Sequence, residues 1–146
     1  MSNFVSIVIP IFNEEGNLVE LIERTLKACR TTAHSFEVIL IDDGSSDTSA
    51  AIIEEATATY EEIIGVFLNR NYGQHAAVFA GFEQSRGDVV ITIDGDLQNP
   101  PEEIPKLISE IEKGYDVVGT VRKKRSDSLF RRMASRMVNR GVRRVT

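Results

Sequence analysis

Two carboxylates separated by one glycine follow an apolar, β-branched run at residues 89–93. Asp94 and Asp96 flank Gly95, and Gln98 lies on the same short stretch. Carboxylate and amide oxygens grouped in one turn suit a hard divalent cation such as Mg²⁺ or Mn²⁺. A glycine lets the phosphates of a ligand approach the backbone. The stretch therefore predicts a cation-assisted site for an anionic ligand, although Asp and Gly are also ordinary turn residues.

Polar clusters also follow the other apolar runs of the chain. They are Asn13-Glu14 after residues 4–10, Asp42-Asp43 after residues 36–41, and residues 69–75 after residues 63–68. Parallel strands of an open α/β sheet bind ligands just beyond their carboxyl ends. We therefore expect these clusters to share one crevice with Asp94 and Asp96. Asp43 on this interpretation is a turn residue.

Two common nucleotide-binding motifs are absent from the sequence. A dinucleotide site needs G-x-G-x-x-G after the first strand, where this chain has IFNEEG at residues 11–16. A phosphate-binding P-loop needs Gly-Lys-Ser/Thr, a triplet that the sequence does not contain. NAD-dependent enzymes and P-loop kinases are therefore poor fits.

The elements that would position these residues alternate between strand and helix patterns. Strands are expected at residues 4–10, 36–41, 63–68, 89–93 and 115–121, with helices at about 18–29, 47–60, 76–84 and 101–113. The strand at 89–93 is apolar throughout and is expected to be buried on both faces. The alternation predicts a Rossmann-like, mostly parallel α/β sheet with helices on both faces.

Charge divides the chain into two parts, which we take as its domains. Residues 1–121 hold seven Lys/Arg and 21 Asp/Glu, whereas residues 122–146 hold ten Lys/Arg and one acid. At 146 residues with 42% apolar content, the chain is large enough for one core. The one cysteine, Cys29, argues against a disulfide framework. No apolar run is long enough to span a bilayer, so a soluble chain is expected.

Residues 126–146 have the pattern of a basic amphipathic helix. Its apolar positions are Leu129, Phe130, Met133, Ala134, Met137, Val138 and Val142, and six arginines flank them. Such a helix is typical of a segment that lies in a membrane interface. The alternative is a helix packed on the sheet with a solvated cationic face. Nucleic acid is not expected as a partner, because aromatic residues that stack bases do not alternate with the arginines.

An acidic crevice has a direct electrostatic consequence for its ligand. A diphosphate about 4 Å from a carboxylate is repelled by several kcal/mol per charge pair at an effective dielectric near 20. A bound divalent cation reverses that sign and stabilises charge on a leaving phosphate. The combination predicts a nucleotide diphosphate whose attached group is transferred.

Several of these stretches resemble the inverting glycosyltransferases of family 2, which have the GT-A fold. The resemblance is carried by IVIPIFNEE, LIDDGSSD, the strand ending in D-G-D, and VVGTVR. LNRNYGQHAA and DGDLQNPPEEIPKL resemble the branch that transfers a sugar from a nucleotide to a polyprenyl phosphate. That branch includes dolichyl-phosphate mannose synthases and bactoprenol glucosyltransferases. The sequence of these two stretches is most similar to that of enzymes that transfer 4-deoxy-4-formamido-L-arabinose to undecaprenyl phosphate for lipid A modification.

The resemblance implies roles for individual residues. Pro10, Asn13 and Glu14 would line the nucleotide pocket, with Asp42 on the uracil. Asp94 would face the ribose and phosphates, and Asp96 and Gln98, with Asp94 beside them, would form the metal site. Arg122 and Arg136 would meet the phosphates of donor and acceptor. The catalytic group would thus comprise Asp94, Asp96, Arg122 and Arg136.

The resemblance also implies partners and a location. The donor would be a UDP-sugar, the acceptor undecaprenyl phosphate, and the site the cytoplasmic face of the bacterial inner membrane, reached through residues 126–146. Relatives of this branch run past residue 146, so the chain is expected to be a C-terminally truncated fragment. A further copy of the chain, in a homo-oligomer, is a candidate partner. Three alternatives stay open for its function: a bactoprenol glucosyltransferase, a family-2 transferase that elongates a polysaccharide, and a non-enzymatic nucleotide-binding recruitment module. The fragment alone is not expected to carry out the full transfer.

Overall fold

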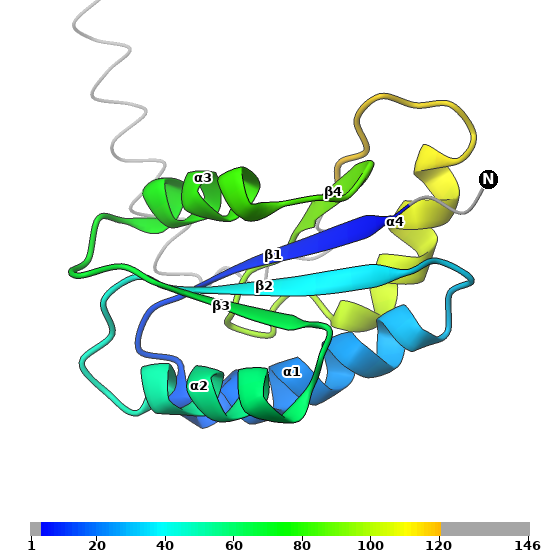
Figure 1. The fold of residues 1–146 in the computed structure, drawn as a ribbon. Helices are drawn as coiled ribbons and strands as arrows, with labels where there is room; N and C mark the ends of the chain where they lie inside the picture. The colour runs from blue at the N-terminus through cyan, green and yellow to red at the C-terminus, as the bar shows by residue number, and fades with distance from the viewer. Residues whose placement is uncertain (1–3, 121–146) are drawn as a thin grey trace, which may run out of the picture. The chain divides into compact units, whose positions relative to one another are not determined.

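The computed structural model of the protein describes residues 4–120. The chain divides into two units, residues 1–116 and residues 117–146, and all described helices and strands belong to the first (Figure 1). In chain order they are β1 (Val5–Ile11), α1 (Glu15–Arg30), β2 (Phe36–Asp42), α2 (Ser49–Thr59), β3 (Ile63–Phe67), α3 (Gln74–Gln84), β4 (Val89–Thr92), the 3₁₀ helix η1 (Pro101–Glu103) and α4 (Ile104–Ile111).

The described strands form one parallel sheet in the order β3-β2-β1-β4. Ile11 at the end of β1 lies opposite Asp42 of β2, and Val8 of β1 lies opposite Thr92 of β4. All four strands point the same way, so the loops that follow them gather at one edge of the sheet. The predicted α/β fold class is confirmed.

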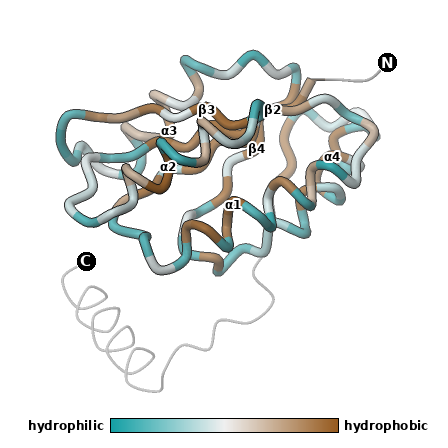
Figure 2. Tube along the Cα trace, turned by 60° about the horizontal axis from the view of Figure 1, so that its bottom comes forward, coloured by the Kyte–Doolittle hydropathy of each residue, from teal (hydrophilic) through white to brown (hydrophobic). Residues whose placement is uncertain are grey.

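Helices cover the two faces of this sheet unequally. In Figure 1, α1 and α2 lie below the strands and α3 lies above them. Figure 2 shows hydrophobic strands between these layers and hydrophilic connecting loops. The larger core lies on the α1 face, where Ile7 and Ile9 of β1 belong to the same buried cluster as Cys29 of α1. Burial raises the pKa of the Cys29 thiol to about 12. None of the described helices combines the length and the apolarity needed to cross a membrane.

Helix α3 approaches the opposite face closely because it presents a glycine and an alanine to the strands. Ala77 is fully buried against Ile41 and Val8. A Cβ added at Gly81 would lie 2.4 Å from Cγ1 of Val8 and 2.8 Å from Cδ1 of Ile41. A larger residue at Gly81 would therefore push α3 away from the sheet.

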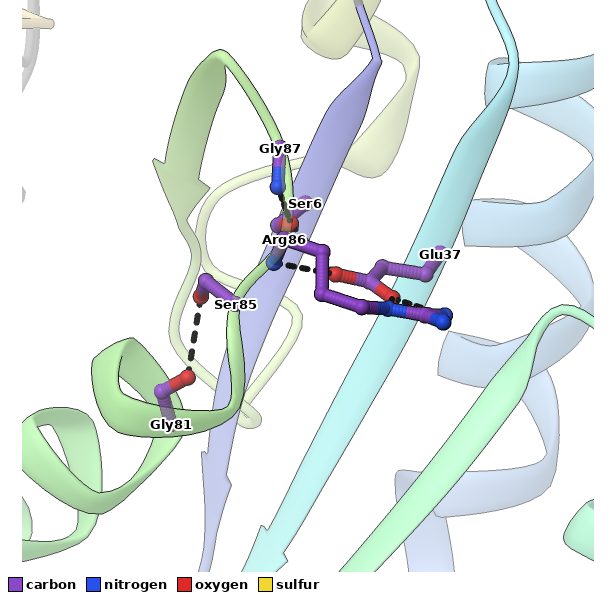
Figure 3. A network of polar contacts seen from close by, with 6 residues as sticks. All are labelled: Ser6, Glu37, Gly81, Ser85, Arg86 and Gly87. Atoms are coloured by element: carbon purple, nitrogen blue, oxygen red, sulfur yellow. Dashed lines mark hydrogen bonds and ion pairs between the residues drawn. The ribbon is translucent and has the colours of Figure 1, made fainter.

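A buried carboxylate fastens the connection between α3 and β4 to the sheet (Figure 3). Glu37 of β2 is 2% exposed, and its Oε1 accepts hydrogen bonds from the Ser6 hydroxyl at 2.6 Å and the Arg86 backbone N–H at 2.8 Å. Its Oε2 accepts from Nε and Nη2 of Arg86 at 2.9 and 2.6 Å. Ser6 Oγ in turn accepts from the N–H of Gly87 at 2.8 Å. These bonds hold the start of β4, and with it the register that carries Asp94 to the far end.

The expectation that residues 89–93 are buried on both faces is wrong for the described part of the chain. Ile91 is 7% exposed, whereas its neighbour Val90 is 42% exposed and Thr92 is exposed as well. The reason is position: β4 is the edge of the described sheet, and α3 lies over β1 and β2 instead. One face of β4 therefore faces the core and the other does not.

The strand expected at residues 115–121 is also absent as far as residue 120, where the description ends. Tyr115 is 59% exposed, and no described strand pairs with this stretch. A β-branched run forms a strand only where a neighbour satisfies its backbone groups. The apolar pattern of residues 115–121 was therefore not sufficient by itself to predict a strand.

Candidate functional site

A cleft of about 330 Å³ opens where the strands end. It is lined by the end of β1, by residues that follow β1, β2 and β4, and by the loop before α3 with the first residue of that helix. These residues are Pro10, Ile11, Phe12, Glu14, Asp43, Asn71, Gln74, Asp94, Gly95 and Asp96. This is the edge at which open α/β sheets bind their ligands.

The D-G-D turn places both of its carboxylates on this cleft. Asp94 Oδ1 accepts a hydrogen bond from Nε2 of Gln74 at 2.8 Å, and Oδ2 accepts from Nδ2 of Asn99 at 3.0 Å. Asp96 Oδ1 accepts from the backbone N–H of Gln98 at 3.0 Å. Asp94 is therefore held by side chains from outside its turn, and Asp96 by its own turn.

Packing gives the central glycine of this turn a second role. A Cβ added at Gly95 would lie 3.0 Å from Cδ1 of Ile11 and 3.1 Å from the carbonyl oxygen of Pro10. The turn thus rests directly on the end of β1. The close approach of a ligand, expected from the sequence, is compatible with this packing but is not its only explanation.

Two residues near the cleft hold a backbone conformation that side chains rarely adopt. Asn13 has φ of 53° and Leu97 has φ of 58°, and among the described residues they are the non-glycine positions with positive φ. Asparagine tolerates this region, whereas leucine is uncommon there. Such strain gathers at ligand-binding sites, because the surroundings must impose it.

Asp43 fastens the loop before α3 to the end of β2. Its side chain belongs to a residue only 2% exposed, and its two oxygens accept the backbone N–H groups of Tyr72 at 2.8 Å and Gly73 at 2.9 Å. Gly44 makes this approach possible, because a Cβ there would lie 2.4 Å from the carbonyl carbon of Arg70. Asp43 therefore does more than shape the turn that the sequence suggested.

Asn13 and Asp42 are directed at the loop after β2 and do not line the cleft. Asn13 Oδ1 accepts a hydrogen bond from the backbone N–H of Ser46 at 2.8 Å, and its own N–H donates to Ser45 Oγ at 2.9 Å. Asp42 accepts the N–H of Ser45 at 3.2 Å and is 4% exposed. Both residues brace the loop that stands beside the cleft.

Of the site residues predicted from sequence, the fold brings Pro10, Glu14, Asp94 and Asp96 together on the cleft. Gln98 is exposed beside it and is not among the lining residues. Arg122, Arg136 and the predicted helix at 126–146 lie outside the described residues.

Asp43, Asn71 and Gln74 belong to the clusters that the sequence placed at this crevice, but the sequence assigned none of them a role in the site, and Asp43 was interpreted as a turn residue. Ile11 and Phe12 also line the cleft and were not among the predicted site residues. The contact of Gln74 with Asp94 could not be predicted, because the two residues are distant in sequence.

The charge of the lining is wholly acidic. Glu14, Asp43, Asp94 and Asp96 contribute carboxylates, and no lysine or arginine of residues 4–120 is among the residues that line the cleft. Within residues 4–120, no three His, Cys, Asp or Glu side chains gather to hold a metal by themselves. Mg²⁺ and Mn²⁺ commonly use one or two carboxylates together with substrate phosphates and water. The donor set therefore fits a cation that arrives with an anionic ligand.

Comparison with known proteins adds a family and several relatives. The model of "Glycosyl transferase family 2" matches residues 6–145. The chain is 60% identical over 144 residues to an undecaprenyl-phosphate 4-deoxy-4-formamido-L-arabinose transferase of Pseudomonas fluorescens, covering 98% of this chain and 42% of that protein. A protein of the same name from Pectobacterium carotovorum is 61% identical over 143 residues, covering 97% and 44%. The chain thus spans less than half the length of these relatives.

Solved structures share the fold. The mannosyltransferase PcManGT of Pyrobaculum calidifontis, in complex with GDP-Man and Mn²⁺, has a TM-score of 0.68 at 17% identity, over 87% of this chain and 37% of that one. S. aureus TarS 1–349 in complex with UDP has a TM-score of 0.58 at 21% identity, over 85% and 40%. At these identities the likeness concerns the fold alone.

Proposed function

The chain belongs to glycosyl transferase family 2, and from this membership we propose that it carries the donor site of an inverting transferase. The donor is a UDP-sugar, and the acceptor is undecaprenyl phosphate. The sugar is 4-deoxy-4-formamido-L-arabinose, as in the names of the relatives about 60% identical to this chain. The observation that carries the proposal is the meeting of Asp94 and Asp96 with Pro10 and Glu14 in one cleft at the carboxyl ends of the strands.

The lining residues suggest how the donor lies. Asp94 faces the ribose and phosphates, and Pro10 and Glu14 line the nucleotide pocket. For the base, the lining favours Asp43 over Asp42, because only Asp43 is among the residues that border the cleft. Asn13 supports the nucleotide pocket indirectly, through its bonds to Ser45 and Ser46.

A divalent cation, Mg²⁺ or Mn²⁺, fits the acidic lining, and Asp96, Asp94 and Gln98 would hold it. When bound, it neutralises the diphosphate and stabilises the charge that the leaving UDP acquires. Support comes from the fold neighbour that is in complex with GDP-Man and Mn²⁺.

The transfer itself needs little proton chemistry from the protein. A phosphate oxygen of the acceptor is already anionic, and it attacks the anomeric carbon from the side opposite UDP. The new C–O bond forms as the bond to UDP breaks, UDP leaves with the electron pair, and the configuration inverts. Arg122 and Arg136 meet the phosphates, since a guanidinium can bind them in a bidentate manner. Residues 126–146 bring this site to the cytoplasmic face of the membrane.

Calorimetric titration of UDP with and without Mn²⁺ tests the proposal. We expect binding that requires the cation and that Asp96→Ala weakens by at least about tenfold, a loss near 1.4 kcal/mol. Glu83→Ala, which removes an exposed carboxylate from α3, should bind as the unaltered chain does. Equal UDP binding in the absence of cation, unaffected by Asp96→Ala, would favour a recruitment module instead.

A further inference from the structure

The carboxylate of Asp94 is held between two side-chain amides. Gln74, the first residue of α3, donates from Nε2 to Oδ1 at 2.8 Å. Asn99, on the loop after β4, donates from Nδ2 to Oδ2 at 3.0 Å. Each oxygen thus receives one amide donor, and the two donors come from different segments of the chain. An acceptor fixed at both oxygens keeps one orientation.

The amide of Gln74 is itself delivered by a well-anchored segment. The residues immediately before it, Tyr72 and Gly73, donate their backbone N–H groups to the buried carboxylate of Asp43 at 2.8 and 2.9 Å. Helix α3 then packs on β1 and β2 through Ala77. Gln74 is therefore placed by the sheet, and the contact with Asp94 links the loops that follow β2, β3 and β4.

The neutral character of both donors has a chemical consequence. An arginine or lysine in either place would cancel the charge of Asp94 and compete with a cation in the cleft. The two amides add no charge of their own, and each occupies one of the lone-pair directions of its oxygen. Neither amide therefore competes with a cation for the carboxylate.

We propose that Gln74 and Asn99 are positioning residues of the donor site, which fix the Asp94 carboxylate in the orientation that receives the sugar nucleotide. This inference rests on the function proposed above, since it assigns the carboxylate a ligand. The two amides act through Asp94, which meets the ligand, although Gln74 also lines the cleft. Asp96, held only by its own turn, has no such outside support among the described residues.

A double-mutant cycle on UDP binding at saturating Mn²⁺ tests the inference. Gln74→Ala is expected to weaken binding about tenfold, the size of one hydrogen bond to a charged group. In an Asp94→Ala background the same substitution should cost less than about twofold, because the acceptor is gone. Asn99→Ala should behave in the same way. Gln84→Ala, the same change at the other end of α3, serves as the matched control and should leave binding unchanged.

A second measurement needs no ligand. In the NMR spectrum of the ligand-free chain, the side-chain NH₂ signals of Gln74 and Asn99 should shift in Asp94→Ala and stay in place in Asp96→Ala. Unshifted signals in Asp94→Ala, or an equal loss of UDP affinity from Gln74→Ala in both backgrounds, would overturn the inference. A chain whose amide signals respond but which does not bind UDP at all would overturn the proposed function and leave the amide clamp standing.

Discussion

The direction of the side chain decides which of two adjacent aspartates lines the cleft. Asp42 and Asp43 are neighbours at the end of β2, where successive side chains point to opposite sides of the chain. Asp42 accepts the N–H of Ser45 in its own loop, whereas Asp43 reaches across to Tyr72 and Gly73. Only the second residue lines the cleft. The Asp43 carboxylate accepts two backbone N–H groups of the loop before α3, and so it also fixes part of the wall of the cleft.

At this scale we expect Asp43→Asn to damage the site more than Asp42→Asn. An amide of the same size replaces one acceptor oxygen with a donor, which then faces the N–H of Tyr72 or Gly73. The unpaired group should lower the free energy of unfolding by roughly 1–3 kcal/mol. UDP affinity should fall about tenfold further than in Asp42→Asn. Urea unfolding measures the loss of stability, and calorimetry measures the UDP affinity. A larger loss of UDP affinity in Asp42→Asn than in Asp43→Asn would assign the contact with the nucleotide base to Asp42.

Among the elements, β4 depends most on contacts far from the cleft. It is short, and it lies at the edge of the described sheet. The Glu37 network in Figure 3 holds its start, and the N–H of Phe4 donates to the carboxylate of Asp88 at 3.0 Å. A slip of one residue along β1 would turn its core side chains outward and carry the D-G-D turn out of place. The amino end of the sheet therefore sets the geometry at its carboxyl end.

Glu37→Gln should destabilise the fold in a pH-dependent manner. Burial raises the pKa of the Glu37 carboxyl, but hydrogen bonds from Ser6 and Arg86 outweigh burial and hold the pKa below its ordinary value. The unfolded chain therefore binds this proton more tightly, so the stabilisation is present above about pH 4.5 and is lost as pH falls through the folded pKa. At neutral pH we expect a loss of roughly 1–3 kcal/mol.

Urea unfolding at about pH 7 and at about pH 3 measures this difference. The difference in unfolding free energy between the unaltered chain and Glu37→Gln should narrow at the lower pH, because the stabilisation that depends on the Glu37 charge decreases as pH falls toward the folded pKa. Glu62→Gln is a useful comparison, since that carboxylate pairs with Arg30 at the surface and should contribute less. A gap that is the same at both values of pH would contradict the role assigned to the charge of Glu37.

Over the whole molecule, the net charge differs between the part of the chain proposed to bind the donor and the part proposed to meet the membrane. The body of the chain is strongly acidic and residues 122–146 are strongly basic. An acidic cleft admits a diphosphate with its cation, and a basic segment attracts anionic lipid headgroups. The part proposed to hold the donor and the part proposed to meet the membrane thus carry net charges of opposite sign.

We expect the chain to bind vesicles that contain anionic lipid more tightly than neutral ones, because the basic residues are attracted to the negative surface. Cosedimentation measures the bound fraction, which should fall as ionic strength rises from about 0.05 to about 0.3 M. Replacing Arg140, Arg143 and Arg144 with glutamine should reduce the difference between the two lipid compositions. Equal binding to both vesicles would remove the membrane from the proposal.

The sequence alone was sufficient for the fold class and for the edge of the sheet at which the cleft opens. Alternating strand and helix patterns imply parallel strands, and D-G-D directly after a strand must lie at their common end. These inferences use only local periodicity and chain order, and both can be read directly from the sequence. The helix predicted at about residues 18–29 is confirmed as part of α1 for the same reason.

Tertiary structure decided which carboxylates share the cleft and which strands are covered. Gln74 meets Asp94, and Asp43 meets Tyr72, across separations that no local pattern records. The exposure of Val90 and the lack of a strand at residues 115–120 depend on the neighbours that the described part of the chain provides, and not on the residues themselves. Burial and loop packing are properties of the assembled chain, and for that reason they could not be derived one segment at a time.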